Sequence, residues 1–329
     1  MSKKVLFKIL LCAILCAAAV RGVNAQTNAP AANAAAQGGP GRDGFGGGFG
    51  RGQQQPPGPP APVPPEVAIA RPSSEDIAKL NADLQELIQK SSDKDLMQKW
   101  GSLLTVQVPR DNPCIRPFGG NPRAPRHQAF VDMATTNDFD ILFEGDSITD
   151  WWQAQPRRPD QPLQDGSEVF QKHFGDLKVA NFAVAGDTTQ GVLWGLKHGE
   201  GQGHKPKVVM IMIGTNNSGN CSGAEIAEGV GAIILEFRDD FPDAKIVLLA
   251  IFPRGAGPSD RQRHVNEDAN KIIAKLQDGK HVFFMNINDK LQDSDGKLIG
   301  FRNDNLHPNP QGYEAWAEAV APTLKTLMN

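Results

Sequence analysis

A serine that follows a short apolar segment has the character of a catalytic nucleophile. The run Ile141-Leu142-Phe143 is continuously apolar, as expected of a strand that is buried on both faces of a sheet. Gly145 permits a tight turn, and the residues after it, among them Ser147, are types that begin helices. Open α/β sheets bind ligands at this end of a strand, and a helix N-terminus favours an oxyanion. Ser147 can equally serve only as a helix cap, so the rest of the chain must decide.

Asp304 and His307 are a candidate acid and base for this serine. They stand three residues apart, directly before a predicted helix. In a turn, this spacing can bring a carboxylate to one imidazole nitrogen, which fixes the tautomer and leaves the other nitrogen free as a base. A serine hydroxyl is a poor nucleophile until such a base takes its proton. A helix cap beside a surface histidine is the ordinary alternative for an isolated Asp-x-x-His.

Gly186 and Asn216 are candidate donors for the negative charge that develops on a carbonyl oxygen under attack. They follow the second and third predicted strands, as Ser147 follows the first. One fixed N–H donor at such a site is commonly worth roughly 3–4 kcal/mol. The Gly186 N–H, the Asn216 side chain and the Ser147 N–H would together form a three-donor oxyanion hole. A glycine turn and an Asx turn explain each residue singly, but their ordered occurrence after successive strands favours the functional interpretation.

The elements that must position these residues alternate along the chain. Further apolar, β-rich runs occur at residues 177–182, 207–213, 245–251 and 281–287. Helical stretches separate or follow them at residues 188–198, 222–239, 259–278 and 309–328. This alternation predicts a parallel sheet covered by helices, with right-handed crossovers and the chemistry in the loops after the strands.

The N-terminal third has a different composition. Residues 1–25 have a basic start, an apolar core and a small-residue cleavage site, as in a signal peptide, and the apolar run is too short for a good transmembrane helix. Residues 26–70 are rich in Ala, Gly, Pro and Gln, which predicts a disordered linker. Residues 71–125 read as a helical lead-in that packs on the main domain, residues 126–329. The protein is therefore expected to be exported, without stable membrane insertion.

Charge and cysteine content narrow the possible partners. The net charge of −3 argues against nucleic acid or an anionic membrane as the main partner. Beyond the predicted signal peptide only Cys114 and Cys221 remain, and they could form one disulfide or be two unrelated thiols. His198, Glu200 and His204 precede a strand, away from the predicted catalytic edge, so we expect no metal site there. Ester hydrolysis by a serine needs no cofactor.

Four ordered blocks resemble the SGNH hydrolase family, also called the GDSL esterase/lipase family. The blocks are Gly145-Asp146-Ser147-Ile148, Gly186, Gly214-Thr215-Asn216-Asn217 and Asp304-Asn305-Leu306-His307. The likeness covers residues 126–328 and is nearest to the catalytic subunits of platelet-activating-factor acetylhydrolase IB. That similarity is carried by Asn181-Phe182, Gly186 to Thr189, Val192-Leu193-Trp194 and Phe252 to Gly255.

The resemblance implies a role for each site residue. Ser147 is the nucleophile and one oxyanion donor, Gly186 and Asn216 are the other donors, His307 is the general base and then the acid, and Asp304 orients it. The implied fold is a three-layer α/β/α sandwich with a flavodoxin-like, five-stranded parallel sheet in the order 2-1-3-4-5. It implies no cofactor, and relatives of this type make a homodimer possible.

This sequence departs from the acetylhydrolase pattern at Ala183 and Ala185, where that pattern tends to have glycines. The extra methyl groups could narrow the oxyanion hole or shift its loop. Trp151, Trp152 and Arg254 are further candidates for the substrate pocket, although we expect one of the two tryptophans to be a core residue and Arg254 could instead form an ion pair.

The leading hypothesis is an exported serine esterase that hydrolyses short-chain acyl esters, acetyl esters foremost, through an acyl-enzyme. The substrate is a small molecule or is borne on a polymer, and its alcohol is a carbohydrate or a lipid or phospholipid. The first alternative is a non-catalytic binding protein on the same fold, which would have no need of Ser147, Asp304 and His307 together. The second alternative makes the Gly/Pro-rich segment an interaction tail at the cell surface.

Overall fold

The structure is a computed structural model that describes residues 56–120, 122–136, 138–152 and 164–329. These residues belong to one compact unit, Arg51–Asn329. The predicted signal peptide and most of the predicted linker lie outside the described residues. Within the described ranges, no helix has the length and apolarity that a membrane span requires.

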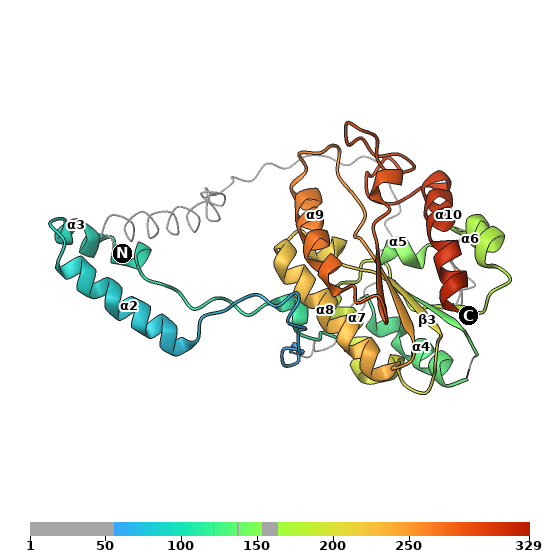
Figure 1. The fold of residues 1–329 in the computed structure, drawn as a ribbon, viewed down its shortest axis with the longest axis horizontal. Coiled ribbons are helices and arrows are strands. Elements are labelled where there is room, and N and C mark those ends of the chain that lie inside the picture. Colours follow the sequence, from blue (N-terminus) through green and yellow to red (C-terminus); the bar gives the residue numbers. More distant parts are fainter. Residues whose placement is uncertain (1–55, 121, 137, 153–163) are drawn as a thin grey trace, which may run out of the picture. The chain divides into compact units, whose positions relative to one another are not determined.

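Five parallel strands form the predicted sheet (Figure 1). They are β1 (Ile141–Gly145), β2 (Val179–Asn181), β3 (Val208–Met212), β4 (Lys245–Leu249) and β5 (Val282–Met285). Their spatial order is β2-β1-β3-β4-β5, which confirms the order 2-1-3-4-5. Strand β1 pairs with β2 on one side and with β3 on the other, so the strand that precedes Ser147 lies inside the sheet.

Helices cover both faces of the sheet. They are α4 (Ala124–Thr136), α5 (Ser147–Asp150), α6 (Ser167–Phe174), α7 (Thr189–Gly195), α8 (Gly223–Asp240), α9 (Arg261–Ile273) and α10 (Pro310–Leu327). Alternate strand residues divide between two cores: Leu142 and Val209 pack with α4, α7, α8 and α9, whereas Ile141 and Phe143 pack with α6 and α10. This period-two division is what a buried sheet requires, and it confirms the three-layer sandwich.

Local sequence signals set several helix ends. Ser222 and Glu225 form a capping box at the start of α8, and Asn309 caps α10 with Pro310 in its first turn. The helix predicted over residues 188–198 is shorter: α7 ends at Gly195 and passes into a distorted turn over Leu196–Glu200, where Gly199 has φ 108°. That positive φ is compatible with glycine and ends the helical geometry.

The lead-in contains two helices, α2 (Ser74–Gln89) and α3 (Lys94–Lys99), which contact each other. The segments on either side of this pair attach to α8. Arg71 forms an ion pair with Glu228 at 2.6 Å, and the Asn112 side chain donates to the same carboxylate at 2.8 Å. Packing of α2 and α3 themselves against the main domain stays a prediction.

Candidate active site

Ser147, His307 and Asp304 form a continuous hydrogen-bonded chain. The distance from Ser147 Oγ to His307 Nε2 is 2.8 Å, and that from His307 Nδ1 to Asp304 Oδ2 is 2.7 Å. Ser147 and His307 are 160 residues apart in the sequence, so the fold brings together what the sequence keeps separate. This is the order nucleophile, base and orienting carboxylate that activates a serine hydroxyl.

The turn from β1 into α5 places the serine. Ser147 is the first residue of α5, and Asp146 caps the helix through a hydrogen bond from Ile148 N to its Oδ1. A Cβ at Gly145 would lie 2.5 Å from Met212 O, so no larger residue fits between β1 and β3 at this point. The serine is consequently fixed directly after the strand, at the carboxyl edge of the sheet.

The base lies on a rigid loop. Asp304 Oδ1 accepts hydrogen bonds from the main-chain N–H groups of Leu306 and His307, each at 3.0 Å. Asn305 between them adopts a left-handed conformation with φ 54°, which asparagine tolerates better than most residues. The Arg302 N–H donates to His307 O at 2.8 Å and closes the loop. His307 is therefore held by its own main chain as well as by its ring nitrogens.

The environment keeps the Asp304 carboxyl ionised. Partial burial by itself would raise the pKa of Asp304, but the hydrogen bonds from His307 and Leu306 outweigh burial and hold that pKa below its usual range. An ionised Asp304 fixes the proton on His307 Nδ1 and leaves Nε2 to accept a proton from Ser147.

The three predicted oxyanion donors follow three adjacent strands, β2, β1 and β3. Gly186 has φ 84°, and a Cβ built on it would have Pro122 Cγ as its nearest neighbour, at 3.7 Å. Asn216 lies in the short turn after β3, and its Nδ2 donates to Asp187 O at 2.8 Å. A side-chain amide has two N–H bonds, so one remains available to a ligand. The assignment of these groups to an oxyanion hole stays a proposal.

The two adjacent tryptophans have different environments. Trp152 is fully buried and packs against Tyr313 and Trp316, so it belongs to the core under α10. Trp151 lies at the site, where its ring stacks on the His307 ring with centroids 4.1 Å apart and an interplanar angle of 19°. Only Trp151 of the pair is brought to the nucleophile and its base.

Arg254 lies between the loop after β3 and the loop of the base. Its Nη1 donates to both oxygens of Thr215, each at 3.1 Å, and the N–H of the next residue, Gly255, donates to Asn305 O at 2.8 Å. The segment after β4 thereby ties the Asn216 turn to the Asp304 loop. Arg254 therefore helps to position the turn that carries Asn216. Its role in substrate binding stays a proposal.

A buried ionic cluster beneath the site was missed from the sequence. Arg123 is fully buried and binds three carboxylates: Glu144 at 2.6 Å, Asp187 at 2.6 Å, and Glu200. His127 contacts Glu200 at 2.7 Å. We call these five residues the Arg123 cluster. Burial raises the pKa of Glu144 to about 8 despite the nearby guanidinium.

The Arg123 cluster reaches the predicted oxyanion loop. Asp187 directly follows Gly186, and its carbonyl oxygen is the acceptor for Asn216 Nδ2. On the other side of the loop, Asp150 accepts from Ala185 N at 3.1 Å. The short segment that carries Gly186 is therefore held at one end by the buried ion pair of Asp187 with Arg123 and at the other by the hydrogen bond from Ala185 N to Asp150.

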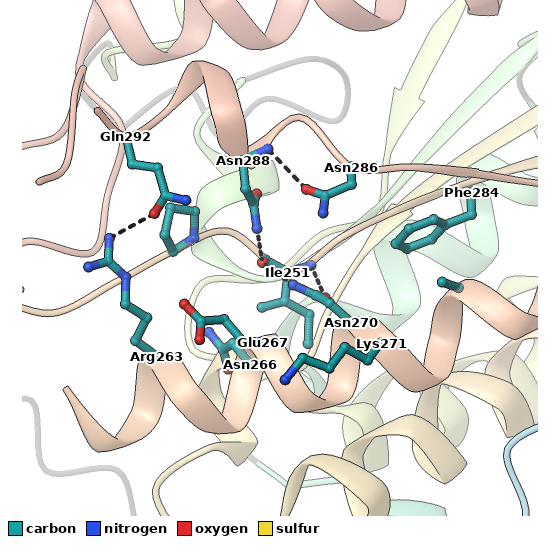
Figure 2. A pocket seen from close by; sticks show the side chains of 12 residues that line it. Ile251, Arg263, Asn266, Glu267, Asn270, Lys271, Phe284, Asn286, Asn288 and Gln292 are labelled. Atoms are coloured by element: carbon teal, nitrogen blue, oxygen red, sulfur yellow. Dashed lines mark hydrogen bonds between the residues drawn. The ribbon is translucent and has the colours of Figure 1, made fainter. Parts of the chain in front are cut away.

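A pocket of about 400 Å³ lies between α9 and the segments after β4 and β5 (Figure 2). Amide side chains dominate its wall, and several are engaged locally: Asn288 Nδ2 donates to Ile251 O, and Arg263 donates to Gln292. None of the site residues predicted from the sequence is among the residues described as lining this pocket.

The sequence left open whether Cys114 and Cys221 form a disulfide. In the structure both are buried free thiols.

Comparison with known proteins supplies the family. The family described as GDSL-like Lipase/Acylhydrolase matches residues 143–315. The chain is 33% identical over 205 residues to the platelet-activating factor acetylhydrolase IB subunit alpha2 of Rattus norvegicus, covering 62% of this chain and 82% of that one. It is 32% identical over 194 residues to the subunit beta homolog of Drosophila melanogaster, covering 57% and 80% of the two chains.

The fold also matches a solved structure. A protein of Streptococcus pneumonia, described as a candidate platelet activating factor, aligns with a TM-score of 0.50 and 23% identity. The alignment covers 61% of this chain and 92% of that one. At this identity the likeness bears on the fold alone, and it agrees with the five-stranded sheet.

Proposed function

The chain belongs to the GDSL-like lipase/acylhydrolase family and is a carboxylic ester hydrolase; from this premise we propose that it is a serine esterase for short-chain acyl esters. The observation that supports this most directly is the chain of hydrogen bonds from Ser147 through His307 to Asp304, at 2.8 and 2.7 Å. If Ser147 were only a helix cap and His307 only a surface residue, two hydrogen bonds this short would not be expected between them and Asp304.

Acylation begins when Ser147 Oγ attacks the ester carbonyl carbon and its proton passes to His307 Nε2. The carbonyl π bond becomes an oxyanion, which the N–H groups of Ser147, Gly186 and Asn216 stabilise. Asp304 stabilises the imidazolium that forms. When the tetrahedral intermediate collapses, the bond to the alcohol oxygen breaks and His307 gives its proton to that oxygen.

Deacylation repeats the same sequence with water. His307 Nε2 takes a proton from water as the water oxygen attacks the acyl carbon, and the second tetrahedral intermediate releases Ser147 Oγ. The proton on His307 returns to Oγ, so the free enzyme and a carboxylic acid result. Every proton transfer in this scheme passes through His307 Nε2.

Acetyl is the proposed acyl group. The support for acetyl is that the relatives are acetylhydrolases by name. A carbohydrate and a lipid or phospholipid are the two classes of alcohol to compare. Platelet-activating factor, the substrate in the relatives' names, is the first lipid ester to test.

We also propose that the protein is exported, and the composition of its N-terminal 25 residues supports this. Lys3, Lys4 and Lys8 precede an apolar stretch that ends near Val23-Asn24-Ala25. Export would place the esterase where polymer-borne esters occur outside the cell. Fractionation of cells that express the full chain, followed by mass spectrometry of the mature N-terminus, tests this directly. Association as a homodimer stays a prediction, and the measured mass in solution tests it.

The decisive experiment compares Ser147→Ala with the wild-type full-length chain on p-nitrophenyl acetate. Removal of a nucleophile that acts together with its base costs about 10⁶-fold in kcat. Ser259→Ala, in an exposed loop after β4, is the matched control and should retain activity. A fluorophosphonate probe should label the wild type at Ser147 and leave the variant unlabelled. If the wild type and Ser147→Ala are both folded and equally slow, the serine mechanism fails and a binding protein on this fold takes its place.

A further inference from the structure

Trp151 occupies a position that the mechanism above does not use. It is the C-cap residue of α5, and its main-chain N–H donates to Ser147 O at 3.1 Å, one turn away. Its ring lies 4.1 Å from the His307 ring at an angle of 19°, which is close to parallel. The same short helix therefore carries the nucleophile and an aromatic face for the base.

The hydrogen bonds to the ring nitrogens of His307 restrain motion in the plane of the ring more than motion perpendicular to it. Asp304 and Ser147 engage the two ring nitrogens, and hydrogen bonds to these atoms lie near the plane of the ring. A flat neighbour against the ring face restrains displacement perpendicular to that plane. Trp151 supplies such a neighbour, because its interplanar angle with His307 allows broad contact.

The stacking has a second consequence during the reaction. His307 becomes an imidazolium when it takes the serine proton. The face of an indole attracts a cation, and tryptophan does so better than phenylalanine. The contact is consequently stronger in the transition state than in the ground state, which is the condition for an interaction to raise kcat.

Arg302 joins the same group of side chains. Its Cζ lies 5.1 Å from the centre of the Trp151 ring, and its main-chain N–H donates to His307 O at 2.8 Å. Its Nε also lies 3.6 Å from Asp165 Oδ2, so the guanidinium is paired with a carboxylate as well as placed over the indole. Arg302 thus helps to hold the indole beside the loop that carries His307.

We propose that Trp151 is a positioning residue for His307: its indole face holds the imidazole in line with Ser147 and favours the imidazolium formed during proton transfer. This inference rests on the proposed serine esterase mechanism. It assigns to Trp151 a role in kcat, whereas the sequence suggested a wall of the substrate pocket.

Trp151→Leu and Trp151→Phe in the full-length chain test the role. For Trp151→Leu we expect kcat for p-nitrophenyl acetate to fall about 5- to 30-fold, the equivalent of a lost cation–π contact, with KM within about 2-fold. Trp151→Phe keeps an aromatic face and should recover most of the loss. The rate at which a fluorophosphonate labels Ser147 should fall in parallel, since it depends on the same base.

A matched control removes a different Trp–His stack. Trp194 stacks on His198 with centroids 4.5 Å apart and also contacts His127 at the edge of the Arg123 cluster, and no ring contact joins Trp194 or His198 to His307 in the described structure. Trp194→Leu should retain kcat and the labelling rate. Thermal unfolding of each variant establishes that the compared proteins are folded.

Three outcomes would overturn the inference. One is Trp151→Leu with unchanged kcat but altered preference between acetyl, butyryl and octanoyl esters, which identifies a pocket wall. Another is Trp151→Phe that is as slow as Trp151→Leu, which excludes the aromatic face. The third is an equal loss of kcat in Trp194→Leu. Ser147→Ala separates these outcomes from failure of the mechanism itself, because it alone tests whether the serine is the nucleophile.

Discussion

Replacement of Arg123 by methionine should destabilise the protein strongly, and by an amount that depends on pH. The substitution keeps an unbranched side chain but removes the guanidinium that serves Glu144, Asp187 and Glu200. All four groups are buried, so neither solvent nor salt can replace the lost charge.

The size of the effect follows from this arrangement. Removal of one partner from a buried ion pair costs roughly 3–5 kcal/mol, because a charge is left buried without compensation. Protonation of the orphaned carboxyls reduces the cost, and the pKa of Glu144 is already raised to about 8 with Arg123 present. At pH 7 we expect a loss of about 3–5 kcal/mol in the free energy of unfolding, a large part of the 5–15 kcal/mol typical of a domain.

The pH dependence has a defined sign. Loss of the cation raises the pKa values of the buried carboxyls, so the folded variant binds more protons than its unfolded state does. Its stability must then fall as pH rises, by up to about 1.4 kcal/mol per pH unit for each such group. The gap between variant and wild type should therefore be smaller at pH 5 than at pH 8.

Urea unfolding at pH 5, 7 and 8 measures this directly. Arg110→Met is the matched control: it also removes an arginine–carboxylate pair, with Glu225 at 2.7 Å, but Arg110 is 60% exposed, and we expect less than about 1 kcal/mol. Addition of Glu144→Gln to Arg123→Met should restore part of the stability at pH 8. An equal loss at pH 5 and pH 8, or a loss no greater than that of Arg110→Met, would refute the reasoning.

The remaining predictions concern the proposed chemistry and the wild-type protein. Asp304→Asn should lower kcat about 10⁴-fold with little change in KM, because an amide N–H facing His307 Nδ1 favours the wrong tautomer of the imidazole. Steady-state kinetics measure this, and a loss in kcat of less than about 10-fold would contradict it. Asn216→Ala should lower kcat roughly 10²–10³-fold, and a change confined to KM would exclude the oxyanion role. The stability of the wild type should fall from pH 5 to pH 8, since the raised pKa of Glu144 lies in that window; urea unfolding that shows a maximum at pH 8 would contradict it.

The sequence predicted the sheet and the hydrogen-bonded site residues for the same reason. In a parallel sheet the carboxyl ends of all strands meet at one edge, so residues that follow successive strands must gather there. Ser147 and Asn216 follow strands with strong apolar signals, β1 and β3. Asp304 and His307 follow β5 after a long loop, and their spacing before α10 was the second signal. The strand order came from the family resemblance.

The Arg123 cluster could not be predicted in the same way. Arg123 lies in the irregular Pro- and Gly-rich segment before α4, where no periodicity indicates which side chains are buried. A signal was nevertheless present in Glu144, a charged residue inside the otherwise apolar strand β1. A carboxylate at such a position needs a buried partner, but the sequence does not say which of the arginines supplies it.

The sequence could not show which of Trp151 and Trp152 is buried, and the reason is geometric. Successive residues of a helix point about 100° apart, since a turn contains 3.6 residues. Helix α5 spans only Ser147–Asp150, too short for an apolar pattern to show which side faces the core. Trp152 is the buried one because Tyr313 and Trp316 of α10, which are distant in sequence, pack around it.

The wide separation of Ser147 and His307 affects how the protein is made. Synthesis proceeds from the N-terminus, so the nucleophile emerges from the ribosome early and the base 160 residues later. Helix α10, which packs over the strand that precedes Ser147, follows later still. A nascent or truncated chain should therefore carry the serine without the means to activate it. Ester turnover would then report completion of the polypeptide, and premature release from the ribosome would yield inert protein.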